Sequence, residues 1–130
     1  MATSDQRILV VDDDPALLKM IGLFLTRMGF SVTLTDSTDR AWAAVEQAAD
    51  GLAGAVLDAS MAGLSTQDLA SRLLAANSSL CVVVASGYPV DMTALQAVAG
   101  RRVEFVQKPF TPQTLGGTLR RMIAAQEEDV

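Results

Sequence analysis

The sequence contains no histidine and only one cysteine, Cys81. The lack of histidine excludes imidazole-based catalytic triads, zinc sites that require imidazole ligands, and a role as a phosphohistidine carrier. A single cysteine cannot form a disulfide within the chain. Cys81 stands in the apolar run LCVVV at residues 80–84, which favours a small buried side chain over a reactive thiol.

An excess of positive charge and a long apolar segment are also missing. The 15 acidic residues outnumber the 10 basic ones, and the net charge is -5. This balance argues against direct binding to nucleic acid or to an anionic membrane, since both require basic patches. No apolar run approaches the length of a membrane span, and residues 1–6 lack the features of a signal peptide. We therefore expect a cytoplasmic protein without membrane insertion.

The length and composition predict one domain with a substantial core, because half of the 130 residues are apolar. Short apolar runs predict strands at residues 8–11, 30–35, 54–57, 80–85 and 103–106. Amphipathic stretches between and after them predict helices at residues 15–28, 38–48, 65–76, 92–98 and 111–125. This alternation predicts an α/β fold, a three-layer doubly wound five-stranded parallel sheet. We expect an N-terminal tail at residues 1–6, the domain at 7–125 and an acidic tail at 126–130.

Polar side chains follow four of the predicted strands. The run Asp12-Asp13-Asp14 follows the first, Asp58 the third, Ser86 the fourth and Lys108 the fifth. Because the carboxyl ends of parallel strands share one edge of the sheet, these groups are expected to converge where ligands bind.

Three adjacent aspartates repel one another unless something offsets their charge. A hard cation such as Mg²⁺ or Ca²⁺ would do so, because these ions prefer oxygen ligands. The alternative is an acidic N-cap beside a helix dipole, for which one aspartate is enough. Together with a lysine and a hydroxyl, the carboxylates indicate phosphoryl transfer, with a carboxylate as nucleophile and a bound Mg²⁺ neutralising the phosphoryl oxygens.

Four short motifs carry a family resemblance: ILVVDDDP at residues 8–15, VLDASMAG at 56–63, VASGY at 84–88 and FVQKPF at 105–110. Each is weak alone, but in this order, each at a strand end, they are specific. The sequence resembles the receiver domain of bacterial two-component response regulators over nearly its whole length. The resemblance implies a flavodoxin-like sheet with strand order 2-1-3-4-5 and a Mg²⁺ cofactor.

The resemblance also implies roles for individual residues. Asp58 matches the phosphoacceptor, and Asp12 and Asp13 match the acidic pair that binds Mg²⁺ together with Asp58. The backbone carbonyl of Ser60 matches the group that completes the metal site. Lys108 matches the lysine that pairs with the phosphoryl oxygens.

Further roles concern residues around this centre. Ser86 and Phe105 match the two switch positions that change the surface formed by the fourth helix, fifth strand and fifth helix. Asp14 is expected to orient metal-bound water, and Tyr88 to shield the site partly. The bond between Lys108 and Pro109 is expected to be cis, which is physically reasonable for an X-Pro bond in a tight turn.

The resemblance implies a histidine kinase or a histidine phosphotransfer protein as phosphodonor, and a downstream protein as target. The Ser-Gly-Tyr and Gln-Lys-Pro-Phe motifs are closer to receivers of hybrid histidine kinases. The chain is expected to be a single-domain regulator or a piece of a longer hybrid kinase.

Three alternatives remain open at this point. A Mg²⁺-dependent phosphohydrolase of the haloacid dehalogenase type would use Asp12 as nucleophile, although Ala16 stands where its motif needs a hydroxyl. A flavodoxin-like electron carrier is disfavoured because three aspartates would repel the cofactor phosphate. A pseudo-receiver that binds partners without being phosphorylated is disfavoured by the full set of site residues.

Overall fold

The computed structural model describes residues 6–46, 51–59 and 65–128. The elements follow one another as β1 (Arg7–Val11), α1 (Pro15–Arg27), β2 (Ser31–Thr35), α2 (Thr38–Val45), β3 (Leu52–Asp58), α3 (Thr66–Ala76), β4 (Cys81–Ser86), α4 (Thr93–Ala99), the short 3-10 helix η3 (Gly100–Arg102), β5 (Val103–Gln107) and α5 (Pro112–Glu128). Every strand and helix expected from the sequence is therefore present.

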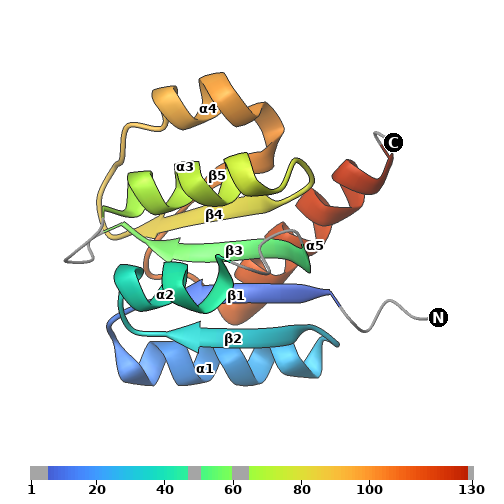
Figure 1. The fold of residues 1–130 in the computed structure, drawn as a ribbon. Helices are drawn as coiled ribbons and strands as arrows, with labels where there is room; N and C mark the ends of the chain where they lie inside the picture. The colour runs from blue at the N-terminus through green and yellow to red at the C-terminus, as the bar shows by residue number, and fades with distance from the viewer. Residues whose placement is uncertain (1–5, 47–50, 60–64, 129–130) are drawn as a thin grey trace.

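The five strands form one parallel sheet in the order β2-β1-β3-β4-β5. This arrangement confirms the predicted doubly wound fold and its strand order. In Figure 1 the visible arrowheads point to the same side of the molecule, so the carboxyl ends share one edge. That edge receives the polar residues that follow β1, β3, β4 and β5.

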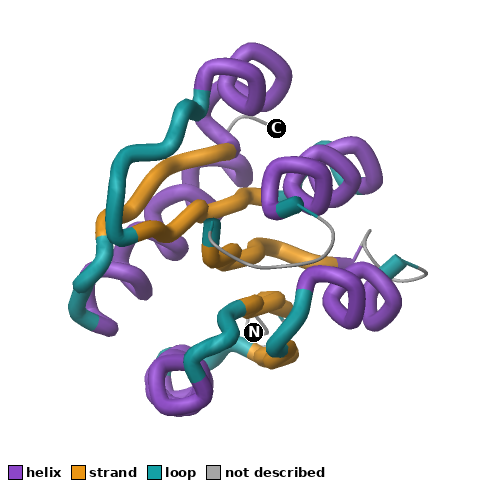
Figure 2. Tube along the Cα trace, turned by 90° about the vertical axis from the view of Figure 1, so that its left-hand side faces the viewer, coloured by secondary structure: helices purple, strands orange, loops and turns teal. Residues whose placement is uncertain are grey.

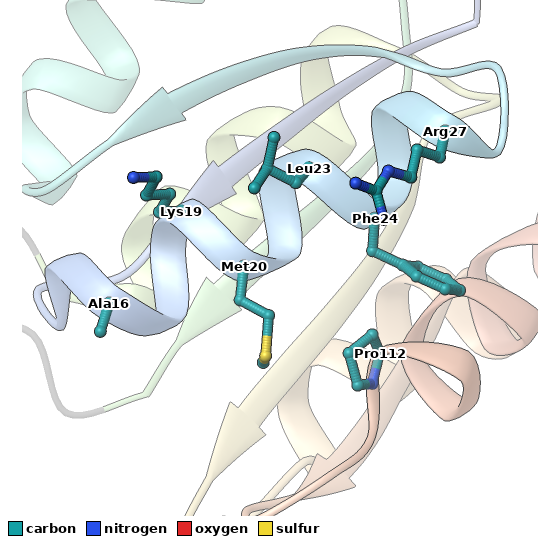
Figure 3. A pocket seen from close by; sticks show the side chains of 7 residues that line it. All are labelled: Ala16, Lys19, Met20, Leu23, Phe24, Arg27 and Pro112. Carbon is teal, nitrogen blue, oxygen red and sulfur yellow. The ribbon is translucent and has the colours of Figure 1, made fainter.

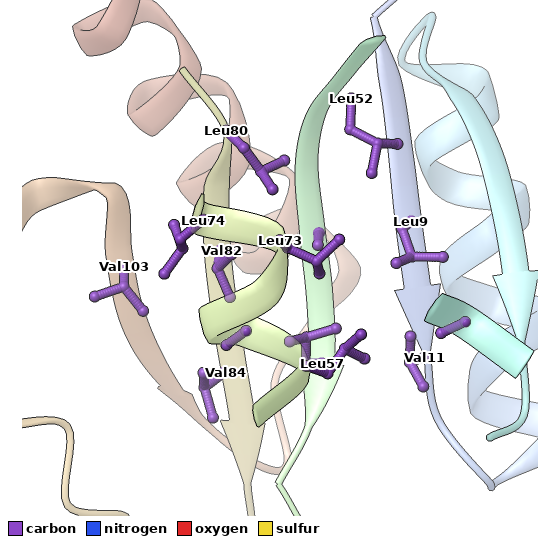
Figure 4. Close-up of a cluster of buried hydrophobic side chains, with 14 of the residues drawn as sticks. Leu9, Val11, Leu52, Leu57, Leu73, Leu74, Leu80, Val82, Val84 and Val103 are labelled. Carbon is purple, nitrogen blue, oxygen red and sulfur yellow. The ribbon is translucent and has the colours of Figure 1, made fainter. Parts of the chain in front are cut away.

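Helices cover both faces of the sheet and bury a separate apolar cluster on each (Figure 2). One cluster joins strand residues such as Leu9 and Leu57 to α2, α3 and α4, and Figure 4 shows its side chains between the sheet and α3. The other joins Ile8, Val10 and Val83 to α1 and α5. The central strands β1, β3 and β4 are almost entirely buried, which explains their unbroken apolar runs.

Side-chain caps and glycine place the helix ends. Ser37 and Ser65 cap α2 and α3 by accepting a hydrogen bond from a backbone N–H of the first turn. Gly29 follows α1 with φ +101°, a conformation that glycine adopts readily and other residues rarely do. Within the described residues, no helix is both long and apolar enough to cross a membrane.

Three boundaries differ from the sequence expectation by more than one residue, and the first is the end of α2 at Val45 rather than residue 48. β3 begins at Leu52 rather than residue 54, because Arg7 pairs with Leu52 across a local irregularity in the β1–β3 register. α5 continues to Glu128, so residues 126–128, expected in an acidic tail, are helical. Glutamine and glutamate favour helix, and nothing between residues 125 and 128 breaks the helix.

Candidate functional site

Three carboxylates meet at the carboxyl edge of the sheet. Asp12 directly follows β1 and Asp58 ends β3, and each is only 3% exposed, whereas Asp13 is exposed. One carboxylate oxygen from each of the three lies within 4.8 Å of the others. The structure thus brings Asp58 together with Asp12 and Asp13, although 45 positions of sequence separate Asp58 from Asp13. This convergence is expected for residues at the carboxyl ends of neighbouring parallel strands.

A single lysine lies against this cluster. Lys108 Nζ is 2.9 Å from Asp12 Oδ2 and 3.5 Å from Asp58 Oδ2. Burial opposes the ammonium charge, but hydrogen bonds and attraction to Asp12 and Asp58 outweigh it and raise the pKa of Lys108 above its usual value. Lys108 therefore carries its charge throughout the neutral range.

The main chain holds Lys108 in place beside β4. Its N–H donates to the carbonyl of Ser86 at 2.7 Å, which continues the pairing of β4 with β5 beyond Gln107. The peptide bond between Lys108 and Pro109 is cis, as the resemblance predicts.

The donor set fits a hard divalent cation. The cluster offers only carboxylate oxygens, which are the ligands that Mg²⁺ prefers, and one of the three groups is open to solvent. Asp12, Asp13 and Asp58 are the residues that would hold it. Ser60, whose carbonyl the resemblance adds to the site, lies outside the described residues.

Asp14 has a different structural role from Asp12 and Asp13. Its Oδ1 accepts hydrogen bonds from the backbone N–H groups of Ala16 at 3.1 Å and Leu17 at 3.3 Å, so it is the N-cap of α1. It does not belong to the carboxylate cluster. The capping alternative is thus correct for one of the three aspartates, and a contact of Asp14 with metal-bound water stays a prediction.

Ser86 lies at the end of β4, one residue beyond Ala85, which pairs with Asp58. Ser86 is 2% exposed, and its Oγ accepts a hydrogen bond from the N–H of Tyr88 at 3.2 Å. Tyr88 itself is 62% exposed. The hydroxyl of Ser86 is therefore buried beside the site, while partial shielding by Tyr88 stays a prediction.

Phe105 pairs with Val84 across the β4–β5 ladder, and its partly buried ring packs on the cluster that α2, α3 and α4 cover. It is thus two ladder positions from the β4–β5 pair that contains Ser86. A coupled movement of Ser86 and Phe105 stays a prediction.

One further residue at this site is not among those expected from the sequence. Thr66, the first residue of α3, is 7% exposed, and its Oγ1 donates to the main-chain carbonyl of Asp58 at 2.6 Å. The available signal was the pair of hydroxyls Ser65 and Thr66 at a helix start, where capping needs only one.

An apolar groove runs along α1 and reaches Pro112 at the start of α5 (Figure 3). Met20 is 40% and Leu23 is 53% exposed, which is unusual for large apolar side chains in an amphipathic helix. Met20 and Phe24 point to the side on which Pro112, at the start of α5, lies. The cationic residues Lys19 and Arg27 complete the lining.

The chain is similar to known proteins along nearly its whole length. The family described as response regulator receiver domain matches residues 8–120. The DNA-binding response regulator MtrA of Mycolicibacterium smegmatis is 30% identical over 129 residues, which are 99% of this chain and 55% of the relative. The transcriptional regulatory protein FixJ of Bradyrhizobium diazoefficiens is 31% identical over 127 residues, 96% of this chain and 60% of the relative. The chain thus spans little more than half the length of these curated relatives.

Solved structures share the fold. A response regulator receiver domain protein (CheY-like) from Methanospirillum hungatei JF-1 has a TM-score of 0.81 at 20% identity, covering 96% of this chain and 98% of the other. The receiver domain from the hybrid histidine kinase CckA has a TM-score of 0.76 at 22% identity, covering 90% of this chain and 98% of the other.

Proposed function

The chain belongs to the response regulator receiver domain family, which acts in two-component signalling, and on that premise we propose that Asp58 is its phosphoacceptor. The observation that carries the proposal is the setting of Asp58. Its carboxylate is buried at a strand end, 3.5 Å from Lys108 and grouped with Asp12 and Asp13. The family match over residues 8–120 identifies neither a phosphohydrolase nor an electron carrier, so both alternatives are set aside.

The proposed reaction moves one phosphoryl group from phosphohistidine to this chain. A carboxylate oxygen of Asp58 attacks the phosphorus, a P–O bond forms, and the P–N bond breaks with its electron pair passing to the imidazole nitrogen. The other ring nitrogen takes up a proton from solvent, so the imidazole leaves as the neutral base. Lys108 supplies positive charge beside the carboxylate, and Ser86 supplies a hydroxyl for a phosphoryl oxygen.

We include Mg²⁺ as the cofactor, held by Asp12, Asp13 and Asp58. Bound Mg²⁺ would neutralise charge on the phosphoryl oxygens during transfer. The support for this assignment is the all-oxygen donor set and the approach of three carboxylate oxygens to within 4.8 Å.

The first experiment is intact mass spectrometry after incubation with acetyl phosphate and MgCl₂. We expect one phosphoryl adduct in the wild-type chain and none in Asp58→Asn or in the presence of EDTA. Asp36→Asn is the matched control, because it makes the same change at an exposed carboxylate that pairs with Arg40 and lies outside the carboxylate cluster. An undiminished adduct in Asp58→Asn would refute the acceptor assignment. A folded chain that takes up no label from acetyl phosphate or from phosphohistidine donors would be a pseudo-receiver.

We propose that the phosphodonor, a histidine kinase or histidine phosphotransfer protein, docks on the groove along α1. The groove starts at Ala16, two residues after Asp14, and includes Pro112, four residues after Lys108, so a partner seated there adjoins the site. Its apolar floor and its cationic residues Lys19 and Arg27 fit a helical surface with apolar and acidic residues. We place this encounter in the cytoplasm.

The output of the domain is proposed to be a change on the surface of α4, β5 and α5 that a downstream protein reads. Phosphorylation adds charge beside Ser86 and Lys108, and it acts by shifting the population between two packings of the switch residues. The support is the position of Phe105 on β5, two ladder positions from the β4–β5 pair that contains Ser86.

A further inference from the structure

A buried hydrogen bond joins the start of α3 to the end of β3. Thr66 Oγ1 donates to the main-chain carbonyl of Asp58 at 2.6 Å, across eight positions of sequence. Thr66 is 7% exposed and Asp58 is 3% exposed, so water has little access to this bond. Leaving a buried carbonyl without its donor costs free energy.

The two ladders of β3 end at different residues. The β1–β3 pairing ends with Val11 and Leu57, one residue before Asp58. On the other side Asp58 pairs with Ala85 of β4, and the N–H of Ala59 donates to the Ala85 carbonyl at 2.9 Å. The hydroxyl of Thr66 therefore adds a restraint at the point where the ladder to β1 has stopped.

The hydroxyl of Thr66 is not used to cap its own helix. Ser65 is the N-cap of α3, and its Oγ accepts from the N–H of Asp68 at 3.0 Å. Two adjacent hydroxyls thus serve separate purposes: Ser65 stabilises the helix and Thr66 contacts the strand that carries Asp58.

We propose that Thr66 is a positioning residue for phosphoryl transfer to Asp58. By fixing the carbonyl of Asp58, its hydroxyl sets the direction in which the carboxylate leaves the end of β3, towards Lys108 and the two other aspartates. This inference rests on the proposed function of Asp58. A misplacement of about 1 Å at a reacting group can slow a reaction roughly 100-fold, so a small shift of this peptide is enough.

The test compares Thr66→Val, which keeps the shape and removes the hydroxyl, with Thr66→Ser, which keeps the hydroxyl. The measured quantity is the initial rate of adduct formation with acetyl phosphate and saturating MgCl₂, at a temperature where circular dichroism shows each variant folded. We expect Thr66→Val to be slower by about tenfold or more and Thr66→Ser to remain within about twofold of wild type. Ser65→Ala is the matched control, because it weakens α3 without touching the Asp58 carbonyl, and its rate should also stay within about twofold.

Three results would overturn the proposal. These are a wild-type rate in folded Thr66→Val, equal slowing in Thr66→Val and Thr66→Ser, or equal slowing in Ser65→Ala. If Thr66→Val does not fold, Thr66→Ala and Thr66→Ser replace it as a pair, since they differ only in the hydroxyl, and equal rates in that pair would also overturn the proposal. The unmodified chain is the reference: if it takes up no label from acetyl phosphate or from a phosphohistidine donor, the phosphoacceptor proposal fails, and this inference fails with it.

Discussion

Lys108 Nζ lies 2.9 Å from Asp12 Oδ2, although 96 positions of sequence separate the two residues. The same nitrogen is 3.5 Å from Asp58 Oδ2, so Asp12 is its nearer partner. Asp12 also accepts a hydrogen bond from the N–H of Asp14 through its other oxygen, at 2.9 Å. The ammonium group therefore offsets the charge of the two buried carboxylates, and it competes for Asp12 with any cation that enters the cluster.

This competition predicts opposite effects of Lys108→Met on metal binding and on phosphoryl transfer. Without the ammonium group, the carboxylates should bind Mg²⁺ about tenfold more tightly, because no positive charge then repels the ion or competes with it for Asp12. Transfer from acetyl phosphate should fall by about tenfold or more, because the phosphoryl oxygens lose a cationic partner. Isothermal titration calorimetry and adduct mass measure the two effects. Lys19→Met makes the same change at an exposed residue of α1 and should alter neither quantity. Weaker Mg²⁺ binding in Lys108→Met would contradict the proposed competition.

The raised pKa of Lys108 predicts a dependence of stability on alkaline pH. The folded-state pKa lies above the unfolded value of about 10.4, so the stabilising effect is fully present below that pH. It is lost as the pH rises through the folded-state pKa. Urea unfolding of wild type and Lys108→Met from pH 7 to 11 should give a constant difference at lower pH that shrinks above about pH 10.4. A difference that grows with alkaline pH would contradict the sign of this shift.

Cys81 should be inert in the folded chain. It is fully buried in β4, and desolvation raises the pKa of its thiol to about 11. Because the thiolate is the reactive form, reaction with a disulfide reagent at pH 8 should be at least ~100-fold slower in the native state than in urea. The measurement is the absorbance change on thiol exchange, and rapid native reaction would show that β4 opens.

The two adjacent glycines of α5 predict opposite effects of alanine. Nothing lies within 4 Å of a Cβ built on Gly117, so Gly117→Ala should raise the free energy of unfolding by about 1 kcal/mol through helix propensity. A Cβ on buried Gly116 would collide with Met28 Sδ and lie 2.9 Å from the Phe24 ring. We expect Gly116→Ala to lower the free energy of unfolding by about 1–3 kcal/mol, measured by urea unfolding. Equal effects of the two changes would show that α1 and α5 do not pack this closely.

Charge reversal on α1 should slow phosphoryl transfer from protein donors but not from small-molecule donors. Lys19→Glu together with Arg27→Glu would repel the acidic partner surface that we propose for the groove. Transfer from a phosphorylated kinase that labels the wild-type chain should slow by about tenfold or more, while labelling by acetyl phosphate should not change. Arg40→Glu together with Arg72→Glu, two exposed residues outside the groove lining, makes the same change in net charge and is the control. Equal transfer rates in both charge-reversed variants would locate the docking surface elsewhere.

Local patterns in the sequence were sufficient to predict the helices and strands and to predict which residues lie at most positions of the site. The apolar runs that end at Val11, Leu57 and Ala85 mark strands buried on both faces, and each is followed by the residue that the site uses. The end of α5 was less predictable, because glutamate residues suit both an exposed tail and a last helical turn.

The sequence by itself determined the parallel α/β fold and the convergence of Asp12, Asp13, Asp58, Ser86 and Lys108, because strand period and strand ends are local properties of the chain. Only the tertiary structure decided which contact each polar side chain makes. Asp14 caps α1, Lys108 lies nearer to Asp12 than to Asp58, and Thr66 donates to the carbonyl of Asp58. Each of these depends on a distance of a few ångströms between side-chain and main-chain atoms. Such distances follow from packing and rotamer choice, which no residue pattern specifies.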